Sequence, residues 1–294
     1  MNPWLLASRP KTLPAAIVPV WVGSMPVLLD DSPATGSWLL FWCTLVGCLC
    51  IQIATNLFND AIDHKKGADT EDRLGPTRVT ATGRLSQKAV LGGALGFCVL
   101  AALIALPLVA ARGWPIVVIG LVSLFFAYGY TGGPFPLAYR GMGEGFVILF
   151  FGFVAVLGSY FVQTGDPGGL PIWILGWQCG LYSAVLIAIN NLRDVDEDRK
   201  TGKRTLAVRF GKTFARWEIA VFCVMALLLS ILFLRDPGSP GFLLLTSAIA
   251  VVSAYLIRGV WRNEPSGLYN KFLALGAVQL ILFGLLASLS FAGR

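Results

Sequence analysis

Charge is scarce in this sequence of 294 residues. Asp, Glu, Lys and Arg together make up 13% of the chain, whereas hydrophobic residues make up 56%. A soluble globular domain carries roughly twice that charged fraction, so the composition argues against a soluble protein and favours one that lies in a lipid bilayer. The net charge of +7 is compatible with nucleic-acid binding, but in a membrane protein it is more typical of loops that face anionic lipid. We therefore expect a bilayer and no nucleic acid as partner.

Soft metal ligands and disulfide motifs are also poorly represented. The chain has one histidine, His64, and six cysteines, none of which forms a CxxC pair. All six cysteines lie inside apolar runs, so the sequence predicts small buried side chains rather than a zinc site or a disulfide framework.

Long apolar runs, in contrast, are abundant. A helix needs about 20 mostly apolar residues to cross the hydrocarbon core of a bilayer. The first residues do not resemble a cleaved signal peptide, because Arg9 and Lys11 follow the first apolar residues. We expect an all-α polytopic membrane protein, a single domain over 1–294, with nine spans around a central cavity: 12–30, 37–60, 88–110, 114–131, 143–163, 170–191, 216–234, 241–258 and 271–291.

The distribution of positive charge predicts an orientation. If the N-terminus lies in the cytoplasm, alternate loops place 20 of the 23 Lys and Arg residues on the cytoplasmic side. Only Arg112, Arg235 and Arg294 fall on the other side. This asymmetry follows the positive-inside rule, and it supports nine spans with a cytoplasmic N-terminus.

Two of these cytoplasmic segments resemble each other. The stretch DHKKGADT at 63–70 follows the second span, and DRKTGKRT at 198–205 follows the sixth. Both read Asp, basic, Lys, any residue, Gly, any two residues, Thr, which is typical of an internal repeat. Polar residues at helical spacing precede or begin each stretch: Asn59 and Asp63 in one, and Asn190, Asp194 and Asp198 in the other.

Carboxylates four residues apart repel each other on a helix, and two such clusters brought together would repel more strongly unless a cation lay between them. Mg²⁺ takes hard oxygen ligands and often bridges carboxylates and substrate phosphates. The alternative is that these charges only mark solvated loops; the pairing of two matching clusters favours the metal. Glu144, after YRGMG, is interpreted as a charge at a helix start.

The two acidic segments and three further stretches resemble those of a known family. NDAID with KKGADT, and NNLRDVDEDRKTGKRTLAVRFG, are similar to the two aspartate-rich motifs of the UbiA superfamily of intramembrane prenyltransferases. The stretches RPKTLPAAIVPVWVG, KKGADTEDRLGP and YTGGPFPLAYRGMGE resemble in particular the 1,4-dihydroxy-2-naphthoate polyprenyltransferases. The first motif of the superfamily often reads NDxxDxxxD, whereas here Gly67 stands at the third Asp position and Asp69 follows it.

The resemblance implies a site at the membrane surface. Asp63, Asp194 and Asp198 are the expected catalytic carboxylates, and with Asp60 and Asp69 they are the expected Mg²⁺ ligands. Asn59 and Asn190 would assist them. The expected diphosphate contacts are Lys65, Arg73, Arg78, Lys203 and Arg204; Tyr130 would form the wall beside the allylic cation, and Arg9, Lys11 and Arg140 would hold the acceptor carboxylate.

The implied reaction joins a polyprenyl diphosphate to 1,4-dihydroxy-2-naphthoate, with loss of diphosphate and CO₂, in menaquinone or phylloquinone synthesis. The implied location is a bacterial plasma membrane, with the site facing the cytoplasm. Octaprenyl, nonaprenyl and phytyl donors all fit the sequence. Another acceptor such as 4-hydroxybenzoate is the nearest alternative, and a transporter is an alternative from another class.

Overall fold

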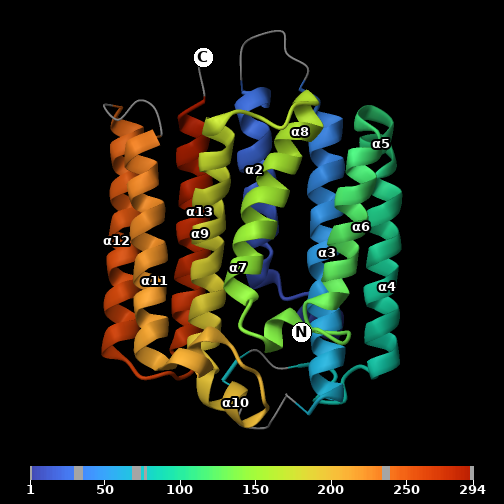
Figure 1. Ribbon diagram of the computed structural model, residues 1–294, viewed down its shortest axis with the longest axis vertical. Coiled ribbons are helices and arrows are strands. Elements are labelled where there is room, and N and C mark those ends of the chain that lie inside the picture. The colour runs from blue at the N-terminus through green and yellow to red at the C-terminus, as the bar shows by residue number, and fades with distance from the viewer. Residues whose placement is uncertain (1, 30–35, 68–73, 76–77, 234–238, 292–294) are drawn as a thin grey trace.

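The protein is an elongated bundle of helices that run side by side, as Figure 1 shows for the computed structural model. The structure describes residues 2–29, 36–67, 74–75, 78–233 and 239–291. Within those ranges every regular element is helical, which confirms the predicted all-α class. The predicted Asp69 and Arg73 lie outside the described residues.

Helices coincide with each of the predicted apolar segments. Among the described residues, seven helices are long and apolar enough to cross a membrane, and the pair Pro3–Thr12 and Pro14–Leu28, bent by 49°, counts as an eighth if the two helices form one span. The helix Trp114–Gly129 is apolar but shorter, so the count of nine spans stays a prediction. The protein is an integral membrane protein. In chain order its elements are α1 Pro3–Ala7, η1 Pro10–Thr12, α2 Pro14–Leu28, α3 Trp38–Lys65, α4 Gln87–Ile104, α5 Leu106–Arg112, α6 Trp114–Gly129, η2 Leu137–Tyr139, α7 Gly143–Val147, the π-helix η3 Ile148–Leu157, α8 Gly158–Thr164, α9 Leu170–Arg193, α10 Val195–Lys200, α11 Leu206–Phe233, α12 Pro240–Arg262 and α13 Tyr269–Leu289.

Small residues bring the central helices close together. A Cβ atom on Gly152 of η3 would lie 2.5 Å from the carbonyl oxygen of Gly176 on α9, and one on Gly23 of α2 would lie 2.2 Å from the carbonyl oxygen of Val156. Only glycine permits such backbone approach, and interfaces between membrane helices are commonly built this way. Side chains of α2, α9, α11, α12 and α13 join η3 in the largest buried apolar cluster.

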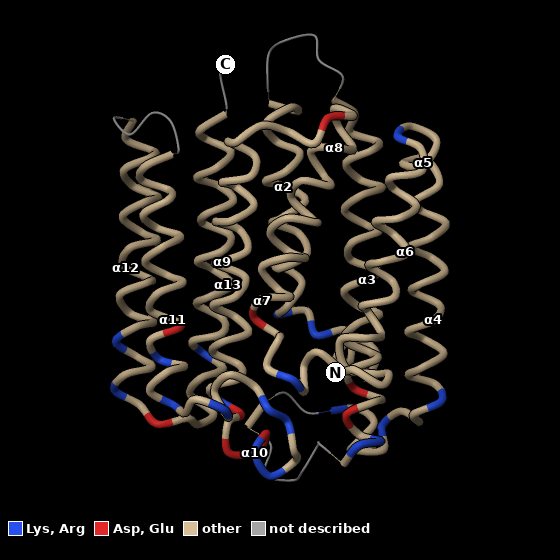
Figure 2. Tube along the Cα trace, in the orientation of Figure 1, with Lys and Arg blue, Asp and Glu red and all other residues tan. Residues whose placement is uncertain are grey.

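Charged residues gather at one end of the bundle. Figure 2 shows Lys, Arg, Asp and Glu concentrated where α3 ends, where α10 lies and where α11 begins, while the middle of the bundle is almost free of them. Arg112 and Asp166 mark the opposite end. Because the helices between these ends are apolar, the charged end lies at a membrane–water boundary.

Candidate active site

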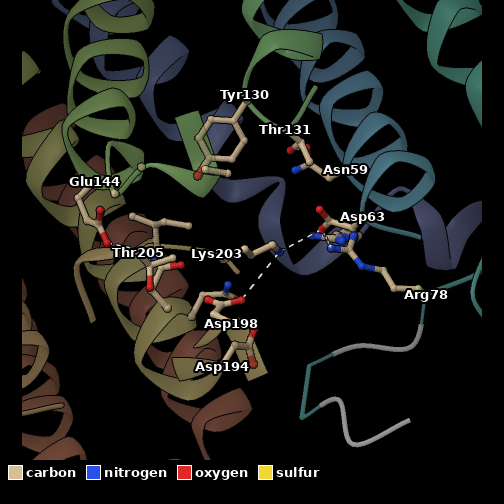
Figure 3. Close-up of a pocket in the computed structure, with 17 residues that line it drawn as sticks. Asn59, Asp63, Arg78, Tyr130, Thr131, Glu144, Asp194, Asp198, Lys203 and Thr205 are labelled. Atoms are coloured by element: carbon tan, nitrogen blue, oxygen red, sulfur yellow. Dashed lines mark hydrogen bonds and ion pairs between the residues drawn. The ribbon is translucent and has the colours of Figure 1, made fainter. Parts of the chain in front are cut away.

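A pocket opens among the loops and helix ends at the charged end of the bundle. Its walls come from the end of α3, the segment after α6, the start of α7, the end of α9, and α10 with the residues that follow it (Figure 3). It is lined by Arg9, Asn59, Asp63, Arg78, Tyr130, Thr131, Ala138, Gly141, Gly143, Glu144, Ile187, Asn190, Asn191, Asp194, Asp198, Lys203 and Thr205.

The end of α3 supplies the first carboxylate of the pocket. Asp63 is buried, and its Oδ2 accepts a hydrogen bond from Nη2 of Arg78 at 2.7 Å. Its Oδ1 accepts one from the hydroxyl of Tyr139 at 2.9 Å. One turn earlier, Oδ1 of Asn59 accepts a hydrogen bond from the hydroxyl of Thr131. The loops after α3 and α6 are thereby fixed to the same helix end.

Asp60 lies on α3 beside this wall and does not line the pocket. Its two carboxylate oxygens accept hydrogen bonds from the backbone N–H groups of Val79 and Thr80, at 3.1 and 3.0 Å. Both oxygens therefore have partners in the loop that follows α3. This arrangement favours an anchoring role for Asp60, and its metal role stays a prediction.

The second polar segment lies where α9 gives way to α10. Asp194, with φ −95° and ψ 9°, separates the two helices, but its N–H still bonds the carbonyl of Asn190 and its own carbonyl accepts from the N–H of Asp198. The three residues thus keep the helical spacing expected for them, and all three line the pocket. Arg193, almost fully buried, holds Asp194 through two hydrogen bonds of 2.7 and 2.6 Å.

Lys203 joins the two segments across the pocket. Its Nζ lies 3.3 Å from Oδ2 of Asp63 and 3.9 Å from Oδ1 of Asp198 (Figure 3). A cation thus stands between carboxylates that are far apart in the sequence. The sequence predicted that the two acidic segments meet, and the structure places both in the wall of one pocket. The roles of the individual residues as metal ligands stay predictions.

Burial shifts the ionisation of the groups in this pocket. It raises the pKa of Asp198 to about 7, while Lys203 acts in the opposite direction. Burial, followed by the charge of Glu144, raises the pKa of the Tyr130 hydroxyl, which therefore stays neutral. Just outside the pocket, burial lowers the pKa of Lys66, whose Nζ donates to the carbonyl of Thr131 at 2.7 Å.

The donor set of the pocket fits a hard divalent cation. Three aspartates, Asp63, Asp194 and Asp198, line it together with Asn59 and Asn190, and the Lys203 ammonium already occupies a position between two of the aspartates. Among the described residues, however, no three acidic, His or Cys side chains form a ready-made metal cluster. Mg²⁺ commonly uses one or two carboxylates together with substrate phosphate oxygens, and this pocket suits that kind of shared coordination.

Several predicted binding residues lie outside the pocket lining. Lys65, Arg204 and Lys11 are exposed, and the exposed Arg140 places its guanidinium 3.4 Å from the ring centroid of Phe135. Arg9 does line the pocket. It adopts a left-handed backbone with φ 52°, which is uncommon outside glycine and asparagine and often marks functional positions.

The residues of the site that were not predicted include Thr131, Tyr139, Glu144 and Asn191. Tyr139 touches Asp63, and its ring lies below Nζ of Lys66 at 4.1 Å. Glu144 is the second residue of α7, which agrees with its interpretation as a charge at a helix start. It is buried, however, with an exposed fraction of only 2%. Its Oε1 accepts a hydrogen bond of 2.7 Å from Nδ2 of Asn191. The one available signal was an acidic residue close to the glycines of YTGG and YRGMG.

Comparison with known proteins identifies the family to which the chain is similar. The model of the UbiA prenyltransferase family matches residues 16–285. The 1,4-dihydroxy-2-naphthoate octaprenyltransferase of Bacillus subtilis is 35% identical over 263 residues, covering 89% of this chain and 82% of its own length. The enzyme of the same name in Escherichia coli is 36% identical over 226 residues, covering 72% and 70%. The structure of a UbiA homolog from Archaeoglobus fulgidus bound to GPP and Mg²⁺ shares the fold, with a TM-score of 0.65, 16% identity, and coverage of 98% of this chain and 100% of that one.

Proposed function

The chain belongs to the UbiA prenyltransferase family, and from this premise we propose that it transfers a polyprenyl group from an allylic diphosphate to 1,4-dihydroxy-2-naphthoate. Diphosphate and CO₂ leave, and the product is a demethylated menaquinone or phylloquinone precursor. The names of the bacterial relatives that align over most of the chain support this acceptor.

The observation that carries the proposal is the meeting of two acidic helix ends in one pocket at the charged end of an apolar bundle. A polyprenyl diphosphate has the same two-part character, because its tail belongs in lipid and its head in water. A transporter would instead place its ionisable residues near the middle of the bilayer. The described middle of this bundle is nearly free of charge.

Different residues of the pocket contribute in different ways to the release of diphosphate. Arg78 and Lys203 present cationic groups that can contact phosphate oxygens. Asp63, Asp194 and Asp198, with Asn59 and Asn190, would hold Mg²⁺. When bound, Mg²⁺ supplies positive charge that stabilises the diphosphate as a leaving group.

The remaining walls suit the allylic cation and the acceptor. Tyr130 lines the pocket, and its ring centroid lies 5.8 Å from that of Phe146. Aromatic faces stabilise a cation without bonding to it covalently. Arg9, near the N-terminus, lines the same pocket and can hold the acceptor carboxylate through a charge-assisted hydrogen bond.

We also propose that the protein lies in a bacterial plasma membrane with this pocket facing the cytoplasm. The gathering of Lys and Arg at the pocket end supports that orientation. Labelling of single cysteines in intact cells tests it. A cysteine placed in the α12–α13 loop should react only after the membrane is permeabilised.

The activity is tested with purified protein in detergent or nanodiscs. We expect prenylated product from 1,4-dihydroxy-2-naphthoate, none from 4-hydroxybenzoate, and none in EDTA; mass spectrometry of the product made from octaprenyl, nonaprenyl and phytyl diphosphates gives the donor preference. Asp63→Asn and Asp198→Asn should remove turnover. The matched control for Asp198→Asn is Asp196→Asn, because Asp196 lies on α10 together with Asp198 but its side chain is 60% exposed. Product from 4-hydroxybenzoate alone would overturn the assignment of the acceptor, and full activity in EDTA would overturn the proposed dependence on Mg²⁺.

A further inference from the structure

Glu144 is a buried carboxylate in the pocket wall that the release of diphosphate does not use. It lies at the start of α7, across the pocket from Asn59 and Asp63 on α3 (Figure 3). The aspartate-rich segments contribute neither Glu144 nor the residues on either side of it. It therefore belongs to the part of the pocket that remains for the acceptor.

The two oxygens of Glu144 have different surroundings. Oε1 accepts a hydrogen bond from the amide of Asn191 at 2.7 Å, which fixes the orientation of the carboxylate. Oε2 is buried and has no hydrogen-bond partner among the described residues. A buried carboxylate oxygen without a donor costs free energy of about 1–3 kcal/mol or more, so its presence in a pocket wall indicates a site for a donor group on a ligand.

The acceptor carries such a donor. In the dihydroxynaphthoate ring a hydroxyl group lies next to the carbon that bears the carboxylate. With the ring carboxylate at Arg9 and this hydroxyl at Glu144, two charged groups of opposite sign fix the two adjacent substituents. We propose that Glu144, oriented by Asn191, is a catalytic residue that binds this hydroxyl and takes up and returns its proton. The inference rests on the proposed function.

The proton balance of the reaction supports the assignment. When the carboxyl-bearing carbon bonds to the allylic carbon, the adjacent hydroxyl loses its proton to Glu144 and becomes a carbonyl. The resulting β-keto carboxylate loses CO₂ as the C–C bond breaks and its electron pair moves to the carbonyl oxygen. Glu144 then returns the proton to that oxygen. The ring becomes a hydroquinone, and no net proton is gained or lost.

Asn191 is a positioning residue in this scheme. It follows Asn190 directly on α9, and both line the pocket, so one turn of helix serves the diphosphate end and the acceptor end together. Gly143 allows the close packing here, because a Cβ on it would lie 3.1 Å from the Tyr130 hydroxyl.

The test compares Glu144→Gln, which keeps size and the Asn191 contact, with the wild-type protein. We expect kcat for dihydroxynaphthoate to fall about 100-fold, the size usual for loss of a general acid–base. Binding of a prenyl thiodiphosphate with Mg²⁺ and thermal stability should stay unchanged. The control is Glu218→Gln, because Glu218 on α11 is half-buried and does not line the pocket. It should retain wild-type turnover.

A second variant separates chemistry from structure. Glu144→Ala should regain turnover when formate is added, because a small carboxylate can occupy the space beside Asn191. Near-wild-type kcat in Glu144→Gln would overturn the role of Glu144, as would loss of thiodiphosphate binding in that variant or failure of formate to restore Glu144→Ala. If the wild-type protein itself does not prenylate dihydroxynaphthoate, the proposed function fails instead, so the two failures are distinguishable.

Discussion

Replacing Lys203 with Met tests whether its ammonium group serves as a cation between the two acidic segments. Nζ lies 3.3 Å from Asp63 and 3.9 Å from Asp198, and the Lys203 side chain is only 14% exposed. At an effective dielectric constant of about 20, the gross attractions are roughly 5 and 4 kcal/mol. Because desolvation offsets part of this and Arg78 remains beside Asp63, we expect a net loss of about 2–4 kcal/mol in EDTA.

The assay is thermal unfolding of the purified protein followed by tryptophan fluorescence, with EDTA or with Mg²⁺. In EDTA the Lys203→Met protein should melt roughly 5–10 °C below the wild type. Mg²⁺ should restore at least half of that difference, because the ion takes the position that the ammonium leaves. In the wild-type protein Lys203 competes with the ion, so Mg²⁺ alone should raise the melting temperature less.

Lys212→Met is the matched control. Its Nζ also has two acidic partners, Asp196 at 3.1 Å and Glu264 at 3.3 Å, but the partners are 60% and 71% exposed. Exposed pairs of this kind contribute about 0–1 kcal/mol each, so this variant should melt near the wild-type temperature and respond to Mg²⁺ as the wild type does. Equal losses in the two variants, or equal Mg²⁺ responses in Lys203→Met and wild type, would refute the reasoning.

Three further predictions concern pH, packing and the loop after α3. Because burial raises the pKa of Asp198 to about 7 and Mg²⁺ binds the ionised form, the Mg²⁺ concentration for half-maximal activity should be higher at pH 6 than at pH 8, and a pH-independent Mg²⁺ titration would contradict this. In EDTA the raised pKa means that the stability contributed by Asp198 is lost as pH rises through 7, and a pH-independent melting temperature in EDTA would contradict this. Gly152→Ala should lower stability by about 1–3 kcal/mol, since its Cβ would lie 2.5 Å from a backbone oxygen, whereas Gly158→Ala, with nothing within 4 Å, should leave the melting temperature unchanged. Asp60→Ala should lower the melting temperature by removing the acceptor of two buried backbone N–H groups, at about 1–3 kcal/mol each, and wild-type stability in this variant would disprove the anchoring role.

The sequence predicted the helical class because apolar runs of membrane length leave few other choices for the backbone. The runs at 37–60 and 170–191 correspond to α3 and α9 within a few residues. The helix-spaced residues Asn190, Asp194 and Asp198 also line one pocket as their spacing implies. These are local properties, since residue spacing and hydropathy are both read within a single helix.

The separate roles of neighbouring acids could not be predicted in this way. Asp60 and Asp63 are both buried on α3, yet one bonds backbone N–H groups of a loop and the other lines the pocket. Which of the two faces the pocket depends on how α3 is rotated against its neighbours. Arg78 and Lys203 reach Asp63 only because two loops, from different parts of the chain, close over the same helix end.

The sequence by itself determined that this protein lies in a bilayer and that most of its Lys and Arg residues fall in alternate loops, and it predicted that two acidic segments form one site, because composition, hydropathy and residue spacing can be read along the chain. Only the tertiary structure decided that Lys203 stands between Asp63 and Asp198, that Tyr139 contacts Asp63, and that Glu144 faces the pocket beside Asn191. The physical reason is that burial and pairing depend on neighbours that packing brings together, and a side chain's sequence position does not identify those neighbours.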